Sequence, residues 1–310
     1  ITYSPVEVTF EDGTTVNLRK PHYEVTDLQY GPMQKDVMMS PRVTPQMIGL
    51  GLLEAISAQD IIAGVDEDDK DGDGISGRAN MVWSPVQKKL MLGRFGWKAG
   101  MPSLKEQTAA AFSGDIGISS SLHKSGAGDC TLKQEFCRKA PDGASEKSGV
   151  EISDELLDLV TFYASNLAVP KRRQPQDEDV LKGKALFNSI GCASCHKPKF
   201  VTKSNPLNPH LEGQVIWPYT DMLLHDMGEG LADHRPEGQA NGFEWRTPPL
   251  WGVGLTKTVS GHEFLLHDGR ARSVEEAILW HGGEGLAAQQ AYRKLSKAER
   301  DWLINFVKSL

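Results

Sequence analysis

The chain has 310 residues, of which 39% are hydrophobic and 24% are charged, and its formal net charge is −7. This composition excludes a disordered or low-complexity chain, and the acidic balance argues against a surface that binds DNA or RNA. The sequence contains no run of about 18 apolar residues, so it predicts no transmembrane segment, and at about 150 residues per domain its length fits two domains.

The sequence predicts a loop-rich protein whose regular elements are mostly helices. It contains 31 glycines and 17 prolines, which favour long irregular connections, and strand-like alternation is scarce. In the first 45 residues, the stretch 6–10 predicts a short extended segment, followed by a turn at Asp12 and Gly13. Because the chain begins with Ile1 rather than Met, we expect it to be processed or trimmed at its start.

An acidic loop follows further along the chain. Asp69, Asp71 and Asp73 match positions 1, 3 and 5 of a calcium-binding loop, and Ile75 stands where a backbone carbonyl serves as a ligand. The closing glutamate of such a loop is absent, because position 12 is Asn80. The pattern therefore leaves two readings open, a bound Ca²⁺ ion or a solvated acidic turn.

Two of the four cysteines, Cys130 and Cys137, lie in a polar, glycine-rich insertion with no histidine beside them. A disulfide between them fits this setting best. Closing so short a loop would stabilise the fold by about 2–3 kcal/mol through the loss of chain entropy in the unfolded state.

Both halves of the chain are predicted to end in a helix. Ser153 caps one helix, which Pro170 ends, and the capping box from Ser296 to Glu299 starts the other. The charged stretch 170–175 is bracketed by prolines and is the best candidate for a linker. We therefore expect an N-terminal domain with insertions over residues 1–170 and a C-terminal domain over residues 171–310.

The remaining cysteines form a C-x-x-C-H motif, with Cys192 and Cys195 followed directly by His196. This is the attachment signature of a c-type haem, in which both thiols bind one porphyrin edge and the histidine binds the iron. A thioredoxin-like pair would need a βαβ context that the sequence lacks, and a zinc site would need a second cysteine pair. The motif therefore predicts covalently bound haem c.

Two stretches that lie 170 residues apart share a pattern. Ser103 begins one capping box and Ser273 begins another, and each box is expected to start a helix. Common capping chemistry explains this pair equally well, but the similar helices at the ends of both halves favour an ancient duplication. A haem motif of the first half is then expected near or before residue 26, and upstream of Ile1 if that half has insertions.

Several stretches besides the haem motif carry a family resemblance: residues 40–43, 49–54, 93–98, 219–228, 245–252 and 267–272. Together with the motif they resemble bacterial di-haem oxidoreductases, often called thiol oxidoreductases, of the superfamily of di-haem cytochrome c peroxidases. The resemblance implies a mainly α, loop-rich fold of two cytochrome c-like domains that face each other. The family carries a second C-x-x-C-H motif near its N-terminus and this sequence contains one, so we expect the N-terminal haem segment to be missing.

The second iron ligand must be chosen among several residues. His281 shares the apolar face of a predicted helix that begins at Ser273, and the resemblance implies a distal ligand at this helix position. We favour His281 over Met227, with His225 and His267 behind them. His267 and Arg270 are expected to lie near the haem propionates.

The first half differs at the matching helix position, where Ala111 stands in place of a ligand. A haem there would be open on one side, with Gln107 and Asp115 close by, similar to the polar peroxide pocket of the superfamily. Asp115 is expected to relay a proton and Gln107 to donate a hydrogen bond, while Trp97 relays electrons between the haems. The alternative is that Gln107 is a surface residue and Asp115 a turn residue.

These observations predict a periplasmic or extracellular c-type haem oxidoreductase of the peroxidase kind, since haem attachment and a disulfide both require such a compartment. The C-terminal haem would relay electrons to an N-terminal active-site haem, and the expected partners are peroxide, a small redox donor protein or the missing N-terminal haem segment. The alternative is an electron-transfer cytochrome module without substrate chemistry. A haem with an open coordination position distinguishes the enzyme from the carrier.

Overall fold

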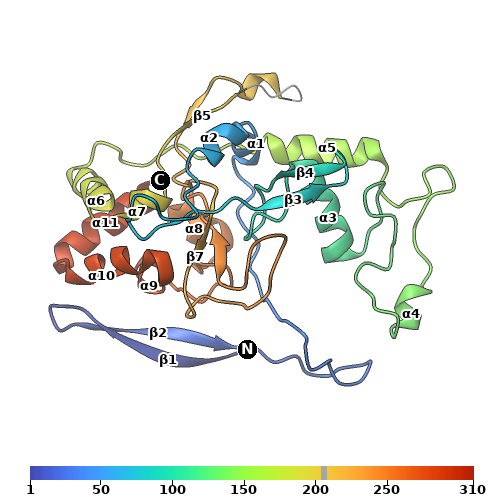
Figure 1. The fold of residues 1–310 in the computed structure, drawn as a ribbon, viewed down its shortest axis with the longest axis horizontal. Coiled ribbons are helices and arrows are strands. Elements are labelled where there is room, and N and C mark those ends of the chain that lie inside the picture. The colour runs from blue at the N-terminus through green and yellow to red at the C-terminus, as the bar shows by residue number, and fades with distance from the viewer. Residues whose placement is uncertain (204–207) are drawn as a thin grey trace.

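The computed structural model describes residues 1–203 and 208–310, and it is rich in loops (Figure 1). The helices are α1 (Leu50–Glu54), α2 (Ala58–Ile62), α3 (Leu104–Ile116), α4 (Glu135–Arg138), α5 (Asp154–Ser165), α6 (Glu178–Ser189), α7 (Cys192–Cys195), α8 (Thr256–Ser260), α9 (Val274–Leu279), α10 (Leu286–Lys294) and α11 (Lys297–Ser309). Short 3₁₀ turns lie at η1 (Pro209–Leu211), η2 (Val253–Leu255) and η3 (Gly283–Gly285). None of the described helices is long and apolar enough to cross a membrane.

The strands pair as short antiparallel ribbons. The ribbons are β1 (Thr2–Thr9) with β2 (Thr15–His22), β3 (Met81–Ser84) with β4 (Lys89–Leu92), β5 (Phe200–Val201) with β6 (Val215–Ile216), and β7 (Leu224–Asp226) with β8 (Glu244–Arg246). The loop-rich character is confirmed. The expectation of a mainly helical chain holds only in part, because these ribbons and the long connections take up much of the molecule.

The predicted capping residues do start helices. The side chains of Ser103, Ser153 and Ser273 each accept a hydrogen bond from a backbone N–H of the first turn, and Ser296 forms a complete capping box with Glu299. These bonds satisfy amide groups that have no partner inside the helix.

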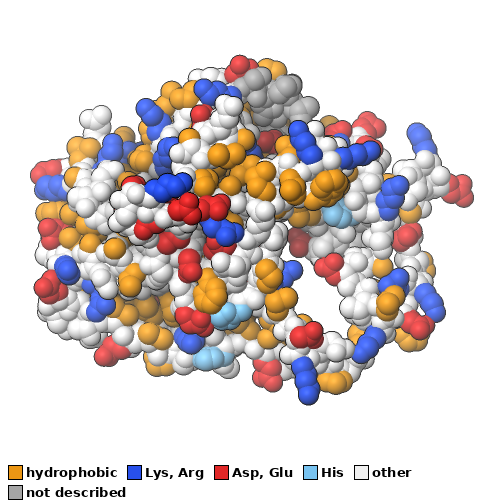
Figure 2. Space-filling model, viewed as in Figure 1, with side chains coloured by type: hydrophobic (Ala, Val, Ile, Leu, Met, Phe, Trp, Pro, Cys, Tyr) orange, Lys and Arg blue, Asp and Glu red, His pale blue; other side chains and the backbone are white. Residues whose placement is uncertain are grey.

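Helix α5 buries a different face from its apolar stripe. Leu157 and Ala164 are buried, whereas Leu159, Phe162 and Tyr163 are more than half exposed. The apolar periodicity of this helix therefore does not identify the face that packs against the core. Hydrophobic side chains gather on the molecular surface over α5 and the β3–β4 ribbon (Figure 2).

The N-terminal β1–β2 hairpin packs against the C-terminal helices and lies beside α9 and α10 in Figure 1. Phe10 and Leu18 are buried in the same core as α6 and α11, and the Phe10 ring meets the Tyr292 ring edge-on at 6.2 Å. Arg300, which is 1% exposed, lies 3.9 Å above the Phe10 ring and donates a hydrogen bond to Asp12. The boundary predicted at residues 170 and 171 stays a prediction, but the hairpin's core contacts lie with the second segment.

The chain forms the same tight loop twice. Phe95 pairs with Met101, and Leu265 pairs with Ala271, at the predicted offset of 170 residues. The second and fifth residues of both loops have positive φ, namely Gly96, Ala99, Leu266 and Gly269. Both loops lead into a serine-capped helix, so this shared backbone supports a duplicated plan.

Helices α6 and α11 cross at very short distance in the larger core. A Cβ atom on Gly183 would lie 1.9 Å from the carbonyl oxygen of Trp302, so no other residue fits at this point without moving one helix. Beside the crossing, the rings of Phe187 and Phe306 pack at 5.2 Å.

We expect Gly183→Ala to lower the free energy of unfolding by about 1–3 kcal/mol, because the added methyl group overpacks the crossing. Gly114→Ala in α3 is the matched control, since nothing lies within 4 Å of the added Cβ there. That control should stabilise the protein by up to about 1 kcal/mol through helix propensity. Denaturant unfolding of both variants measures the difference, and equal effects would contradict the close crossing.

Candidate haem site

One large cavity, of about 1610 Å³, joins residues from both halves of the chain. Its lining includes most residues that the sequence predicted for the site: Trp97, Gln107, Ala111, Asp115, Cys192, Cys195, His196, Met227, His267 and His281. The predicted residues therefore converge on one space, although up to 184 residues separate them along the chain (His281 minus Trp97).

The C-x-x-C-H motif is positioned by a sharp turn after α6. Gly191 has φ of 92°, which favours glycine, and it leads directly into α7, the short helix that carries Cys192 and Cys195. Both cysteines are free thiols, and burial raises the pKa of Cys192 to about 12. The Cys192 thiol is therefore held in its neutral form beside the cavity.

The ring of His196 is fixed by the backbone of a distant segment. Its Nδ1 lies 2.9 Å from the carbonyl oxygen of Tyr219, a geometry in which Nδ1–H donates and Nε2 is left as the metal-binding atom. Burial lowers the pKa of His196 to about 4, so the imidazole is neutral near pH 7. Both properties suit an iron ligand.

His281 has a similar arrangement just after α9. Its Nδ1 lies 2.7 Å from the carbonyl oxygen of Ala277, and burial lowers its pKa. Within the described residues, no hydrogen bond involves Nε2 of either His281 or His196. Met227 remains a neighbour, because a Cβ atom on Gly285 would lie 3.1 Å from Cβ of His281 and 3.3 Å from Cε of Met227.

The other two histidines considered as ligands are engaged elsewhere. Both ring nitrogens of His225 lie within 2.7 Å of a carboxylate oxygen, Asp221 on one side and Glu284 on the other. Burial alone would lower the pKa of His225, but these hydrogen bonds outweigh it and raise the pKa well above 6.5. His267 stacks on Trp245 with ring centroids 3.8 Å apart, and burial lowers its pKa to about 4.

Arg270, predicted near the propionates, is not among the residues that line the cavity. Its guanidinium donates to Asp268 and to the carbonyl of Gly230, and it lies 4.8 Å above the Trp280 ring. Arg246 and Arg42 do line the cavity. Sequence reasoning missed them, although both belong to stretches that carry the family resemblance.

One face of α3 forms the opposite part of the cavity, with Gln107, Ala111 and Asp115 one helical turn apart from each other. The side-chain oxygen of Gln107 is buried and has no hydrogen-bond partner within the described residues. Such an orphaned acceptor is costly unless a ligand or water satisfies it. Asp115 is exposed at the cavity's edge.

Trp97 lines the cavity and is hydrogen-bonded to two other segments that line it. Its indole N–H donates to the carbonyl of Val43 at 2.7 Å, and its own carbonyl accepts from the backbone N–H of Arg246. The backbone N–H of Val43 in turn donates to the carbonyl of His267, the residue equivalent to Trp97 in the second loop. The two loops are thus joined through one residue.

The acidic loop brings three carboxylates together, but the residue at position 12 does not complete a ligand set around them. Asp69, Asp71 and Asp73 each place an oxygen within 4.8 Å of the others, and acidic side chains gather over this loop in Figure 2. Asn80, at position 12, is 1% exposed and turned inward, where its amide donates to the carbonyls of Lys98 and Glu237. Asn80 is therefore not available as the closing ligand.

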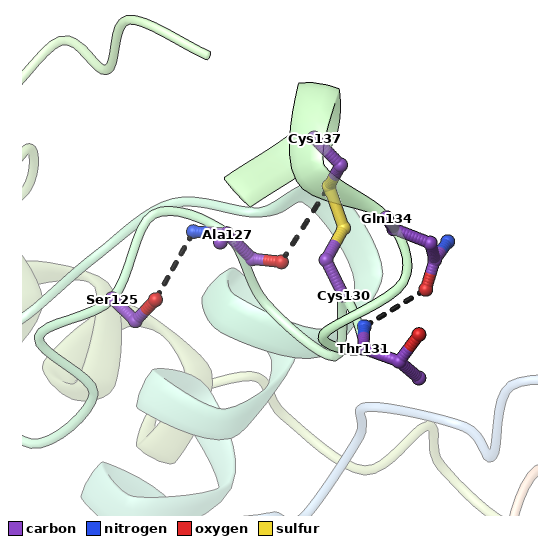
Figure 3. The surroundings of a disulfide bond; sticks show 6 residues. All are labelled: Ser125, Ala127, Cys130, Thr131, Gln134 and Cys137. Atoms are coloured by element: carbon purple, nitrogen blue, oxygen red, sulfur yellow. Dashed lines mark hydrogen bonds between the residues drawn. A yellow bond between two sulfur atoms is a disulfide. The ribbon is translucent and has the colours of Figure 1, made fainter. Parts of the chain in front are cut away.

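Cys130 and Cys137 form a disulfide, with Cα atoms 6.3 Å apart (Figure 3). It ties α4 to the preceding loop, whose backbone is held by a hydrogen bond from Ala127 N–H to the Ser125 hydroxyl. This disulfide compensates for sparse packing, because residues 129–149 contain no buried position.

If the acidic loop binds calcium in the folded state alone, calcium raises the thermal midpoint by linkage, and Asp71→Asn weakens this response. The measurement is thermal unfolding in chelator and in millimolar calcium. Identical midpoints of the unsubstituted chain would leave only the acidic-turn reading.

We expect covalent haem on Cys192 and Cys195 when the chain matures in a haem-ligating compartment, because α7 presents both thiols to the cavity beside His196. Intact mass and the visible spectrum measure this. The double variant Cys192→Ala/Cys195→Ala should lose the covalent adduct, whereas replacing the disulfide pair by alanines should retain it. A chain without added haem mass after such expression would contradict the assignment.

A search of the curated proteins finds no match to this chain. Among solved structures, a chain of Kuenenia stuttgartiensis hydrazine synthase pressurized with xenon aligns over 94% of this chain and 98% of its own, at 16% identity. Its TM-score of 0.34 is too low to support a conclusion on fold or function.

The family model described as "Di-haem oxidoreductase, putative peroxidase" matches residues 1–310, which is the whole chain. The match agrees with a cavity that gathers two thiols and the neutral imidazoles of His196 and His281. This protein therefore belongs to the di-haem oxidoreductase family.

Proposed function

We propose that this chain is a c-type haem oxidoreductase of the peroxidase kind, with haem attached to Cys192 and Cys195 and iron bound by His196 and His281. One observation carries the proposal: two free thiols and two imidazoles with available Nε2 atoms line one cavity. Haem c bound there supplies an iron centre that cycles between two oxidation states.

The charges of the residues that line this site suit a group with an uncharged ring and charged edge groups. His196 and His281 are neutral because burial lowers both pKa values, so neither must lose a proton before binding iron. Arg246 is buried and lines the cavity, and burial lowers its pKa to about 10. We assign to Arg246 and His267, rather than Arg270, the role of holding the propionates.

The α3 face is our candidate for the second haem site and the peroxide pocket. Ala111 leaves this face open at the position equivalent to His281, and the family is a di-haem one. Gln107 would orient the substrate through its amide, and the Asp115 carboxylate would take up and return the proton that peroxide cleavage requires. Trp97, which lines the same cavity, would carry electrons from one site to the other.

The site is proposed to work in the periplasm or outside the cell, where a small redox protein supplies electrons. Covalent haem attachment and the Cys130–Cys137 disulfide both support such a compartment. The competing function is an electron-transfer module, which is favoured by the single C-x-x-C-H motif of this sequence. An open-coordinate haem decides between them, because a carrier does not need one.

Replacing His281 tests the second iron ligand. His281→Met should keep six-coordinate iron and raise the midpoint potential, since a thioether ligand stabilises the reduced state. His281→Ala should convert the visible spectrum to a high-spin form, and Met227→Leu serves as the matched control that leaves it unchanged. An unaltered spectrum and potential in His281→Ala would transfer the role to Met227 or another residue.

Replacing the α3 residues tests the peroxide pocket. Gln107→Ala and Asp115→Ala should each slow the reaction with peroxide by about 10²-fold, because substrate orientation and proton transfer are lost. The rate is measured by stopped-flow mixing of protein that carries a haem at both sites, and the spectrum of the haem on Cys192 should not change. Glu155→Ala on α5, outside the cavity, is the matched control. Full reactivity in both α3 variants would favour the carrier function.

A further inference from the structure

His225 lies between two carboxylates that come from distant parts of the chain. Its Nε2 is 2.7 Å from Asp221 Oδ2, and its Nδ1 is 2.6 Å from Glu284 Oε2. The side chain is 3% exposed, and Asp221 and Glu284 are shielded as well. Two carboxylates at this distance hold the imidazole in its charged form, in contrast to His196 and His281, which line the same cavity.

The Asp221 side of this bridge belongs to the segment that orients His196. The backbone N–H of Asp221 donates to the carbonyl of Cys195 at 3.0 Å, and the neighbouring Thr220 N–H donates to the carbonyl of Lys197. Two residues before Asp221, the carbonyl of Tyr219 fixes Nδ1 of His196. These hydrogen bonds therefore hold the segment 219–221 against the haem motif.

The Glu284 side belongs to the turn that carries His281. Glu284 lies three residues after His281 within η3, and its Oε1 accepts hydrogen bonds from the Ser76 hydroxyl and the Asp226 backbone N–H. The turn packs tightly on the end of β7, because a Cβ atom on Gly283 would lie 2.2 Å from the carbonyl oxygen of Asp226. A displacement of Glu284 would therefore also shift the position of His281.

A buried ion pair network of this kind is strongly destabilised when one member is removed. The charge that remains has lost its partner in a region from which water is excluded, and such losses cost several kcal/mol. Hydrogen bonds from His225 and Ser76 outweigh burial and lower the pKa of Glu284, which keeps its carboxylate ionised near neutral pH. The bridge is therefore rigid as long as all three groups are present.

We propose that His225 is a positioning residue that joins Asp221 to Glu284 and thereby holds His196 and His281 at a fixed separation across the cavity. This inference rests on the proposed haem coordination. His225 itself does not bind iron, since both of its ring nitrogens are occupied by carboxylates. Its role is to hold the second ligand in place.

The test uses the haem-loaded protein and the variants His225→Gln and Glu284→Gln. Glu284→Gln retains an oxygen for the Ser76 and Asp226 contacts but removes the charge that faces His225. The matched control is His234→Gln, because His234 forms an exposed pair with Glu229 at 3.2 Å. Intact mass verifies the attached haem, and circular dichroism verifies the fold.

We expect both bridge variants to lose low-spin signal in the ferric visible spectrum and to shift the midpoint potential, while His234→Gln matches the unsubstituted protein. Added imidazole should restore the low-spin signal, because it occupies the iron position that His281 has left. The double variant should lose no more signal than either single variant, since both break the same bridge.

Two results would overturn the proposal. Unchanged spectra and potentials in a folded, haem-loaded Glu284→Gln would show that the bridge does not position His281, even if His225→Gln fails to fold. A lost low-spin signal that imidazole does not restore would assign the effect to general damage. If the unsubstituted protein itself lacks a low-spin, six-coordinate haem, the proposed coordination fails first, and the bridge loses its role with it.

Discussion

The close crossing of α6 and α11 at Gly183 is the constraint on which the haem site depends. It brings the rings of Phe187 and Phe306 together, and the ring of Tyr219 packs against both at 5.7 Å. The Tyr219 carbonyl holds Nδ1 of His196, while the end of α6 leads through Gly191 into the two cysteines. A contact between two backbones thus determines where the imidazole and the thiols lie.

The histidines that line the cavity differ in charge because their hydrogen-bond partners differ. His196, His267 and His281 line it and are neutral, because burial without a strong partner disfavours the protonated form. His225 also lies close to the motif, but two carboxylates keep it charged. The same residue type therefore provides a neutral candidate ligand or a structural cation, and its hydrogen-bond partners decide which.

The repeated loop shows how one backbone can support two different chemistries. Both copies share the bridge, the positive φ angles and the capped helix that follows. The side chains differ at equivalent positions. Trp97 of the first copy corresponds to His267 of the second, and Ala111 corresponds to His281. One copy presents an imidazole to the cavity and the other leaves an open face with an orphaned glutamine oxygen. Such asymmetry suits one relay site and one reactive site.

The sequence by itself determined features that depend on neighbouring residues. The C-x-x-C-H motif, the serine caps, the extended segment and turn near the N-terminus, and the short disulfide loop all follow from local spacing and chemistry. Helical spacing also predicted the position of His281 and the α3 face, because one helical period places Gln107, Ala111 and Asp115 together.

Only the tertiary structure decided which groups meet across the chain. It turned Asn80 inward, held Arg270 outside the cavity against the Gly230 carbonyl, exposed apolar side chains of α5 and packed the N-terminal hairpin on the C-terminal helices. It also placed His225 between Asp221 and Glu284, which lie 63 residues apart in sequence. Partners so distant leave no periodic or local signal, because their contact is fixed by packing of the whole fold rather than by spacing along the chain.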